Sequence, residues 1–191
     1  MMHAAGVAYL ESGQGGVPLV CLHGIGGKAE SFRPQLDGLG SQLHILSWDM
    51  PGYGLSEPVS SVTFEIMSEK LGQFLRVKGF DRVHLAGHSI GGMIALDYAL
   101  RSPERVSSLI LIATTSAFGG REPEFRDRFL EQRLGALETG GSMRQAAEQL
   151  VPKIVGASAR SAVIDEATAW MADVPVDAYR GAGRPEATFQ L

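Results

Sequence analysis

The stretch Arg82–Leu100, RVHLAGHSIGGMIALDYAL, predicts a short buried strand, a sharp turn at Ser89 and an apolar helix. Its segment GHSIG fits the pattern G-x-S-x-G, and the strand and helix on either side are the setting that this pattern requires. A serine at so tight a turn needs glycine two positions before and after it, because a Cβ there would clash with neighbouring backbone. We therefore interpret Gly87 and Gly91 as spacers and Ser89 as a candidate nucleophile.

The helix that begins after Ser89 adds a second chemical feature. Its first N–H groups have no partner within the helix, and its positive end favours negative charge. A reaction that develops an oxyanion beside Ser89 would be stabilised there. The alternative interpretation, a glycine-rich turn with an idle serine, remains open from these residues alone.

Composition narrows the function classes. The chain has 191 residues, of which 45% are apolar and 20% charged, as expected for one globular core. Seventeen basic residues against 21 acidic ones give a net charge of −4 without a basic block, which argues against nucleic acid and anionic membrane surfaces as partners. No apolar run is long enough to span a bilayer, and the start lacks the features of a secretory signal. The single cysteine, Cys21, lies in an apolar run and predicts a buried thiol in a reducing cytoplasm. We expect no metal and no cofactor.

The first 117 residues alternate between apolar runs and amphipathic segments. This alternation predicts βαβ units, hence a mostly parallel sheet with helices on both faces. One strand is expected before the apolar run VPLVCLH. The expected strands are Val7–Glu11, Val17–His23, His44–Trp48, Val83–Ala86 and Val106–Thr114, and the expected helices between them are Ala29–Leu39 and Thr63–Phe80.

From about Phe118 the pattern changes to charged, amphipathic segments with no strand between them. Three helices are predicted, over Arg121–Leu137, Met143–Val155 and Ala159–Val174. We interpret residues 118–191 as a helical cap laid over the core formed by residues 1–117. The cap offers possible pocket walls, although at helical spacing such side chains also serve as ordinary packing; they are Phe125, Phe129, Trp170 and Met171.

Three motifs in this order give the chain a family resemblance. They are LHGIGG at residues 22–27, DMPGYGLSE at residues 49–57 and GHSIGG at residues 87–92. With these motifs the chain resembles the α/β-hydrolase superfamily over essentially its whole length, and it looks most like the 3-oxoadipate enol-lactonases. The resemblance implies an α/β-hydrolase fold whose last two strands are absent, plus a helical cap.

The resemblance also implies roles for particular residues. Ser89 would be the nucleophile, and the backbone N–H groups of Ile25 and Ile90 would form an oxyanion hole, with Gly24 leaving room in the first loop. His23 is expected to order its loop, and His88 to support the site with its side chain turned away from the attack path. For Asp49, which precedes a Pro-Gly turn, we expect hydrogen bonds to loop amides.

One expected part of the machinery is not in the sequence. In the superfamily an acid and then a histidine follow the nucleophile in chain order. All five histidines precede Ser89, and they are His3, His23, His44, His84 and His88. A serine without a base is a poor nucleophile at neutral pH. We therefore expect a C-terminally truncated fragment with little turnover, whose last strand Val106–Thr114 leaves an apolar edge open. A homo-oligomer or a complementing C-terminal chain could cover that edge.

These observations leave several functions to weigh. The leading hypothesis is a serine hydrolase acting on a small-molecule ester or enol-lactone through an acyl-enzyme. The alternatives are a non-catalytic module that binds small molecules in the same fold, and a haloperoxidase-like or carbon–carbon hydrolase activity. A substrate or product with carboxylates would require an arginine. The sequence does not select among the candidates Arg121, Arg144, Arg160, Arg180 and Arg184.

Overall fold

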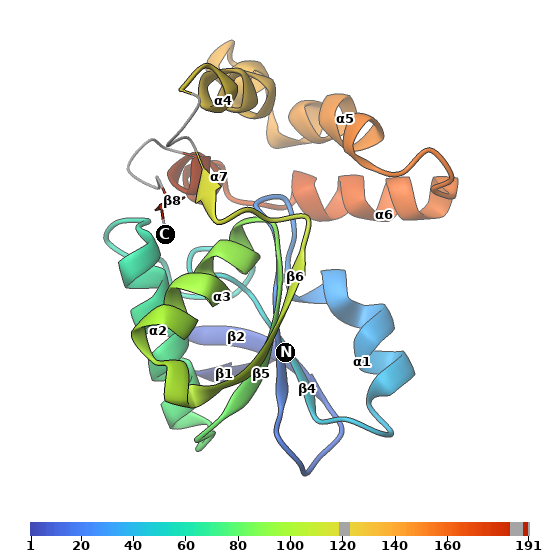
Figure 1. The fold of residues 1–191 in the computed structure, drawn as a ribbon. Coiled ribbons are helices and arrows are strands. Elements are labelled where there is room, and N and C mark those ends of the chain that lie inside the picture. The colour runs from blue at the N-terminus through green and yellow to red at the C-terminus, as the bar shows by residue number, and fades with distance from the viewer. Residues whose placement is uncertain (119–122, 184–188, 191) are drawn as a thin grey trace.

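The computed structural model describes residues 1–118, 123–183 and 189–190 (Figure 1). Its main sheet has six strands in the order β1-β2-β4-β3-β5-β6. β1 and β2 pair antiparallel, β2 runs antiparallel to β4, and β4, β3, β5 and β6 are mutually parallel. The predicted α/β class with a mostly parallel sheet is confirmed. The strands are β1 (Met2–Ala4), β2 (Val7–Ser12), β3 (Leu19–Leu22), β4 (Ile45–Trp48), β5 (Val83–His88) and β6 (Val106–Ile112).

Helices cover both faces of this sheet, as Figure 1 shows. The short 3₁₀ helix η1 (Ala29–Phe32) and α1 (Arg33–Leu39) lie on one face, and α2 (Phe64–Val77) and α3 (Ile90–Arg101) lie on the other. Alternation along β3 explains the two layers. Cys21 packs with Phe32 and Leu36 on the α1 side, whereas its neighbours in sequence pack with the larger core on the α2–α3 side. A second 3₁₀ turn, η2 (Pro103–Arg105), leads from α3 into β6.

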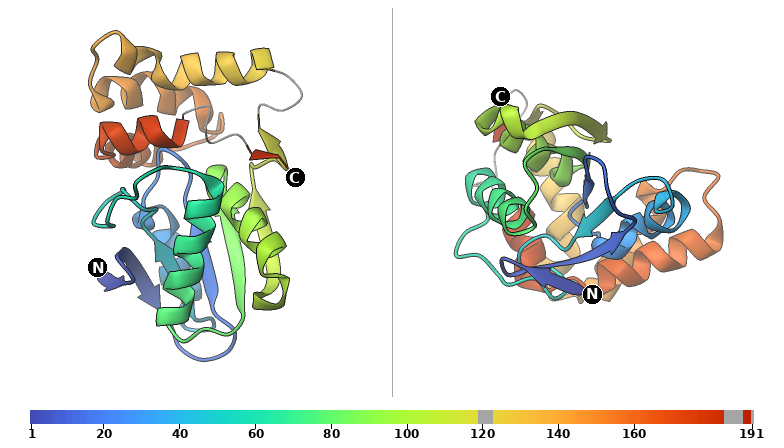
Figure 2. Two further views of the ribbon diagram at one scale, coloured as in Figure 1. Left: turned by 90° about the vertical axis from the view of Figure 1, so that its left-hand side faces the viewer. Right: turned by 90° about the horizontal axis from the view of Figure 1, so that it is seen from below.

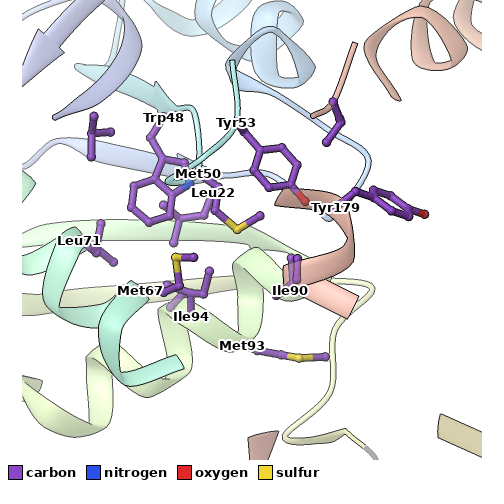
Figure 3. Close-up of a cluster of buried hydrophobic side chains, with 14 of the residues drawn as sticks. Leu22, Trp48, Met50, Tyr53, Met67, Leu71, Ile90, Met93, Ile94 and Tyr179 are labelled. Carbon is purple, nitrogen blue, oxygen red and sulfur yellow. The ribbon is translucent and has the colours of Figure 1, made fainter. Parts of the chain in front are cut away.

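The larger core explains why α2 forms where the sequence pattern predicts it. Thr63 caps the helix, since its side-chain oxygen accepts a 3.2 Å hydrogen bond from the N–H of Ile66. The apolar residues recur at helical spacing and are buried against the sheet. Figure 3 shows Met67 and Leu71 of this helix facing Trp48 and Met50 across the core.

Helices α4–α7 form a separate layer beyond the carboxyl ends of the parallel strands (Figures 1 and 2). They are α4 (Pro123–Glu138), α5 (Met143–Ile154), α6 (Ser161–Ala172) and α7 (Val176–Gly183). Their buried side chains, among them Leu150, Met171 and Tyr179, belong to the same apolar cluster as the sheet residues. The layer is thus packed onto the sheet, and the division at residue 117 into two domains stays a prediction.

The structure corrects four details of the predicted elements. Two strands, not one, precede β3, because residues 2–4 pair with β2 as a hairpin. The segment Ala29–Leu39 is divided into η1 and α1, with Pro34 in the first turn of α1. The helical layer has a fourth helix, α7, which was not predicted because it is too short to show a clear hydrophobic periodicity. Within residues 118–191 the two-residue strand β8 (Phe189–Gln190) pairs with β7 (Ala117–Phe118).

The edge strand β6 is the least covered part of the main sheet. Three consecutive apolar residues on it are exposed, Ile110 at 47%, Leu111 at 44% and Ile112 at 41%. Apolar edge strands of this kind template pairing with another chain. The expectation of an open apolar edge over Val106–Thr114 agrees with this exposure.

Candidate functional site

Ser89 lies in the turn that connects β5 to α3. Its φ of 53° and ψ of −121° lie in a region that non-glycine residues rarely adopt. The surrounding backbone holds it there: the N–H of Ser89 donates to the carbonyl of Ile112 at 3.0 Å, and the hydroxyl of Thr114 donates to the carbonyl of Ser89 at 2.7 Å. A strained serine fixed by the neighbouring strand is the local geometry that the sequence pattern anticipates.

The glycines on either side of Ser89 are required by crowding. A Cβ on Gly91 would lie 2.6 Å from the carbonyl carbon of Leu22 and 2.7 Å from the carbonyl oxygen of His23. A Cβ on Gly87 would lie 2.5 Å from the carbonyl oxygen of Gly91. All of these neighbours are backbone atoms, which cannot turn aside as a flexible side chain can. The turn can therefore form only with glycine at both positions.

The loop that follows β3 passes beside this turn. A Cβ on Gly24 would lie 3.3 Å from Cβ of Ser89 and 2.8 Å from Nδ1 of His88, so the loop and the turn are in close contact. The next residue, Ile25, accepts a 3.0 Å hydrogen bond on its carbonyl from the hydroxyl of Tyr53. Among the described residues the Ile25 N–H has no hydrogen-bond acceptor. Ile90, as the first residue of α3, likewise has an N–H without an intrahelical partner.

His23 is buried and both of its ring nitrogens are engaged. Nδ1 lies 2.8 Å from the carbonyl oxygen of Gly24, and Nε2 accepts a 2.9 Å hydrogen bond from the N–H of Met50. Desolvation by burial lowers the pKa of His23 to about 4, so the ring is neutral and joins two loops. The expectation that His23 orders its loop agrees with these contacts.

Asp49 anchors the same pair of loops. Its carboxylate accepts hydrogen bonds from the N–H groups of Ala29 at 2.7 Å and Leu55 at 3.4 Å. Burial raises the pKa of this carboxyl, and the two amide hydrogen bonds oppose the rise. The prediction that Asp49 binds loop amides is confirmed. Cys21 is also buried as predicted, and burial raises the pKa of its thiol to about 12, which keeps it protonated and unreactive.

A cavity of about 580 Å³ lies between Ser89 and the helical layer. It brings together Ser89, His88 and the loop of residues 23–27 on the sheet side with side chains of α4–α7 on the other. The walls on the helical side are mostly apolar and comprise Phe129, Arg133, Leu150, Val151, Ile154, Val155, Ala167, Trp170, Met171 and Tyr179. Three of the four predicted pocket residues line the cavity, and the surroundings of the fourth, Phe125, lie outside what the structure describes.

His88 lines the cavity beside Ser89, with its ring against Gly24. Desolvation lowers the pKa of His88, although its side chain still reaches solvent. Within residues 1–118, 123–183 and 189–190 no hydrogen bond joins Ser89 Oγ to a histidine or a carboxylate. The prediction that the His88 side chain is turned away from a reacting carbonyl stays a prediction.

Sequence reasoning missed several cavity residues, and the charged one among those on the helical side is Arg133. Its Cζ lies 4.7 Å from the ring centroid of Phe129, one helical turn before it on α4. Two of the arginines considered from the sequence, Arg144 and Arg160, are exposed on the outside of the layer. Arg180 donates to the carbonyl of Leu137 at 3.1 Å, and Arg121 and Arg184 fall outside the described residues. The i, i+4 spacing of Phe129 and Arg133 is the signal that could have placed this arginine on the pocket face.

The described residues hold no cluster of three or more histidine, cysteine or acidic side chains suited to a metal ion. In that same part of the chain, no helix has the length and apolar character needed to cross a bilayer.

Comparison with known proteins supports the fold and a family. A family model described as the alpha/beta hydrolase fold matches residues 17–172. The pimeloyl-[acyl-carrier protein] methyl ester esterase of Salmonella heidelberg is 34% identical over 126 residues, which are 63% of this chain and 48% of that protein. The dihydrolipoyllysine-residue acetyltransferase component of the acetoin cleaving system of Pseudomonas putida is 36% identical over 103 residues, 53% of this chain and 28% of that protein.

Solved structures show the same fold. An esterase from Thermogutta terrifontis superposes with a TM-score of 0.81 at 22% identity, covering 93% of this chain and 65% of that one. The enol-lactonase from Burkholderia xenovorans LB400 gives a TM-score of 0.79 at 21% identity, covering 93% and 68%. The chain spans about half the length of this methyl ester esterase and of a putative carbamate hydrolase from Azorhizobium caulinodans that is 33% identical over 126 residues.

Proposed function

Because this chain belongs to the α/β-hydrolase family, we propose that its cavity binds a small ester or lactone and that Ser89 attacks the carbonyl to form an acyl-enzyme. One observation carries the proposal: Ser89 is held at φ 53° in the wall of a 580 Å³ cavity, at the N-terminus of a helix. A strained, cavity-facing serine in this setting is the geometry that exposes a nucleophilic hydroxyl.

The amides of Ile25 and Ile90 would stabilise the charge that develops in this reaction. Attack by Ser89 Oγ on the carbonyl carbon moves an electron pair onto the carbonyl oxygen. Two preorganised N–H donors lower the energy of that oxyanion, and removing one such donor typically reduces the rate by about 10²–10³-fold. The peptide group that carries the Ile25 N–H is held through the carbonyl of Gly24, which lies 2.8 Å from His23 Nδ1 and accepts a 2.9 Å hydrogen bond from the N–H of Gly27. Collapse of the intermediate expels the alcohol, and water then hydrolyses the acyl-enzyme.

The proton of Ser89 needs an acceptor, and we propose that polypeptide outside these 191 residues supplies it. His23 is excluded as that base because both of its nitrogens are already engaged. The relatives are about twice as long as the matched part of this chain, which leaves room for a base in the whole protein. Without it, triad-less enzymes retain only about 10³–10⁴-fold over water. The isolated chain should therefore turn over very slowly.

A polypeptide partner over β6 belongs to the same proposal. Its three exposed apolar residues lie on an edge strand of the sheet, and either a second copy or a complementing chain would cover them. For location we propose the cytoplasm, on the ground that the single cysteine is buried and unpaired.

Labelling with a fluorophosphonate tests the nucleophile directly. The 191-residue chain should acquire one label at Ser89, slowly, and faster when imidazole is added as an external base. Ser89→Ala should remain unlabelled, whereas Ser31→Ala, which removes another cavity-lining serine, should be labelled as the wild type is. Equal labelling of Ser89→Ala and wild type would exclude Ser89 as the nucleophile. Absence of any label with imidazole present would favour the non-catalytic binding module.

The same chain should hydrolyse a p-nitrophenyl ester barely above the buffer rate. Rapid turnover by the 191 residues alone would contradict the proposed external base.

A further inference from the structure

The turn that carries the Ile25 N–H is covered by helix α6 of the helical layer. Residues 24–27 form this turn, which closes when the N–H of Gly27 donates to the carbonyl of Gly24 at 2.9 Å. Its two central residues are Ile25 and Gly26. A Cβ placed on Gly26 would lie 3.3 Å from Cγ and 3.4 Å from Sδ of Met171, in the last turn of α6. The Met171 side chain therefore lies directly against the turn.

Hydrogen bonds hold this turn on either side of Gly26, but not at Gly26 itself. The carbonyl of Gly24 lies 2.8 Å from a ring nitrogen of His23, and the carbonyl of Ile25 accepts a 3.0 Å hydrogen bond from the hydroxyl of Tyr53. Among the described residues, no hydrogen bond involves the N–H or the carbonyl of Gly26. Glycine has the widest conformational freedom of any residue. Packing against α6 is thus the contact that restricts the turn at this position.

Met171 is itself held firmly in the layer. Its side chain is buried and belongs to the apolar cluster that joins the sheet to the helices. A second contact links the same two segments, because Nζ of Lys28 lies 3.5 Å from Oδ2 of Asp173. Both charged groups reach solvent, so this ion pair contributes little to the free energy of folding. The position of α6 over the turn is therefore set mainly by the burial of Met171.

We propose that Met171 is a positioning residue for the oxyanion hole, because it keeps the turn at Gly26 in one conformation, with the Ile25 N–H available to the oxyanion. This inference rests on the proposed function for the roles of Ser89 and Ile25. An oxyanion donor is most effective when it is preorganised, since no free energy is then spent on reordering it during the reaction. The helical layer would act on the bond-forming step itself, in addition to forming a wall of the cavity.

Fluorophosphonate labelling of the 191-residue chain, with imidazole as the external base, tests this role. Labelling rates over a range of probe concentrations separate probe binding from the bond-forming step. Met171→Ala should lower the maximal labelling rate by about ten-fold, which is part of the loss of about 10²–10³-fold expected when a whole donor is removed. The probe concentration that gives half of the maximal rate should change by less than about two-fold, because the lost effect belongs to the transition state.

A matched methionine separates this role from general stability. Met143, in α5, is buried in the same apolar cluster but does not line the cavity. Met143→Ala and Met171→Ala should both lower the Tm, because each leaves a void in the core. Met143→Ala should nevertheless keep the maximal labelling rate of the wild type. Met171→Leu conserves the volume of the side chain and should retain most of that rate.

A second-site change tests the contact between Met171 and Gly26 directly. In Met171→Ala, a methyl group added by Gly26→Ala would point into the space that Cγ and Sδ have vacated. The double variant should therefore label about three-fold faster than Met171→Ala, because the two positions act through one contact and their effects are not additive. Met171→Val removes less of the side chain and should label at an intermediate rate; it replaces Met171→Ala in the comparison if that variant does not fold.

Several results would overturn the proposal. They are a wild-type maximal rate in the Met171 variants, a change confined to probe binding, an equal slowing by Met143→Ala, and a double variant that labels no faster than Met171→Ala. In each of these cases the wild type is still labelled at Ser89, so the proposed nucleophile stands and only the positioning role fails. Absence of labelling at Ser89 in the wild type would overturn both the proposed function and this inference.

Discussion

Replacing Gly91 by alanine sets two opposing effects against each other at the candidate site. Gly91 lies in the first turn of α3, where alanine would ordinarily stabilise the helix by about 1 kcal/mol. The new Cβ, however, would meet the carbonyl carbon of Leu22 at 2.6 Å and the carbonyl oxygen of His23 at 2.7 Å, whereas ordinary contacts begin at 3.4 Å. Both neighbours are backbone atoms, so the end of β3 must move away from α3 by most of an ångström.

The clash should dominate this balance. Overpacking of a tight interior typically costs about 1–3 kcal/mol, and backbone neighbours place Gly91 at the upper end of that range. The net loss is about 2 kcal/mol, which for a chain of this length lowers the Tm by about 4–8 °C. The displacement also moves the loop that carries Ile25, so fluorophosphonate labelling of Ser89 should fall as well.

Gly135 provides a matched control. It lies in α4, and a Cβ there would have no neighbour within 4 Å. Gly135→Ala should therefore raise the Tm by about 2–4 °C through helix propensity alone. Far-UV circular dichroism during heating measures both variants. A Gly91→Ala protein as stable as wild type, or one that shifts in the same direction as Gly135→Ala, would refute the crowding argument.

Two further predictions concern the far end of the sheet and its edge. Burial alone would raise the pKa of Glu11, but hydrogen bonds from His44 at 2.7 Å and Lys78 at 2.9 Å outweigh it and leave the pKa lowered. A lowered folded-state pKa stabilises the protein above the unfolded pKa and loses that effect as the pH falls through the folded value. Glu11→Gln should thus lower the Tm at neutral pH and approach wild type in acid; a constant difference across this range would contradict the linkage. At the edge of the sheet, Ile110→Lys places a charge on exposed β6 and should reduce self-association in light scattering, whereas an unchanged or larger particle size would show that β6 is not the contact surface.

The sequence by itself determined the elements and the position of the candidate nucleophile. Alternation of apolar runs with amphipathic segments identified the parallel strands, because burial on both faces leaves a continuous apolar run. Glycine spacing around Ser89 identified the turn, because backbone crowding is local and permits no side chain there. The role of Asp49 was also readable, since a carboxylate before a Pro-Gly turn has few partners other than nearby amides.

Elements that are too short to show a hydrophobic periodicity could not be predicted from the sequence, and β1 and α7 were missed for that reason. Neither has enough residues to display a repeat, and each depends on a partner distant in the sequence or on the packing of a whole layer.

Only the tertiary structure decided which side chains share the cavity with Ser89. Arg133 and Tyr179 come from two helices separated by about 40 residues, and no local pattern relates them to each other or to the turn at β5. Hydrophobic periodicity shows that a helix has a buried face, but not which other face it meets. The partner of each face is set by how the whole layer packs on the sheet.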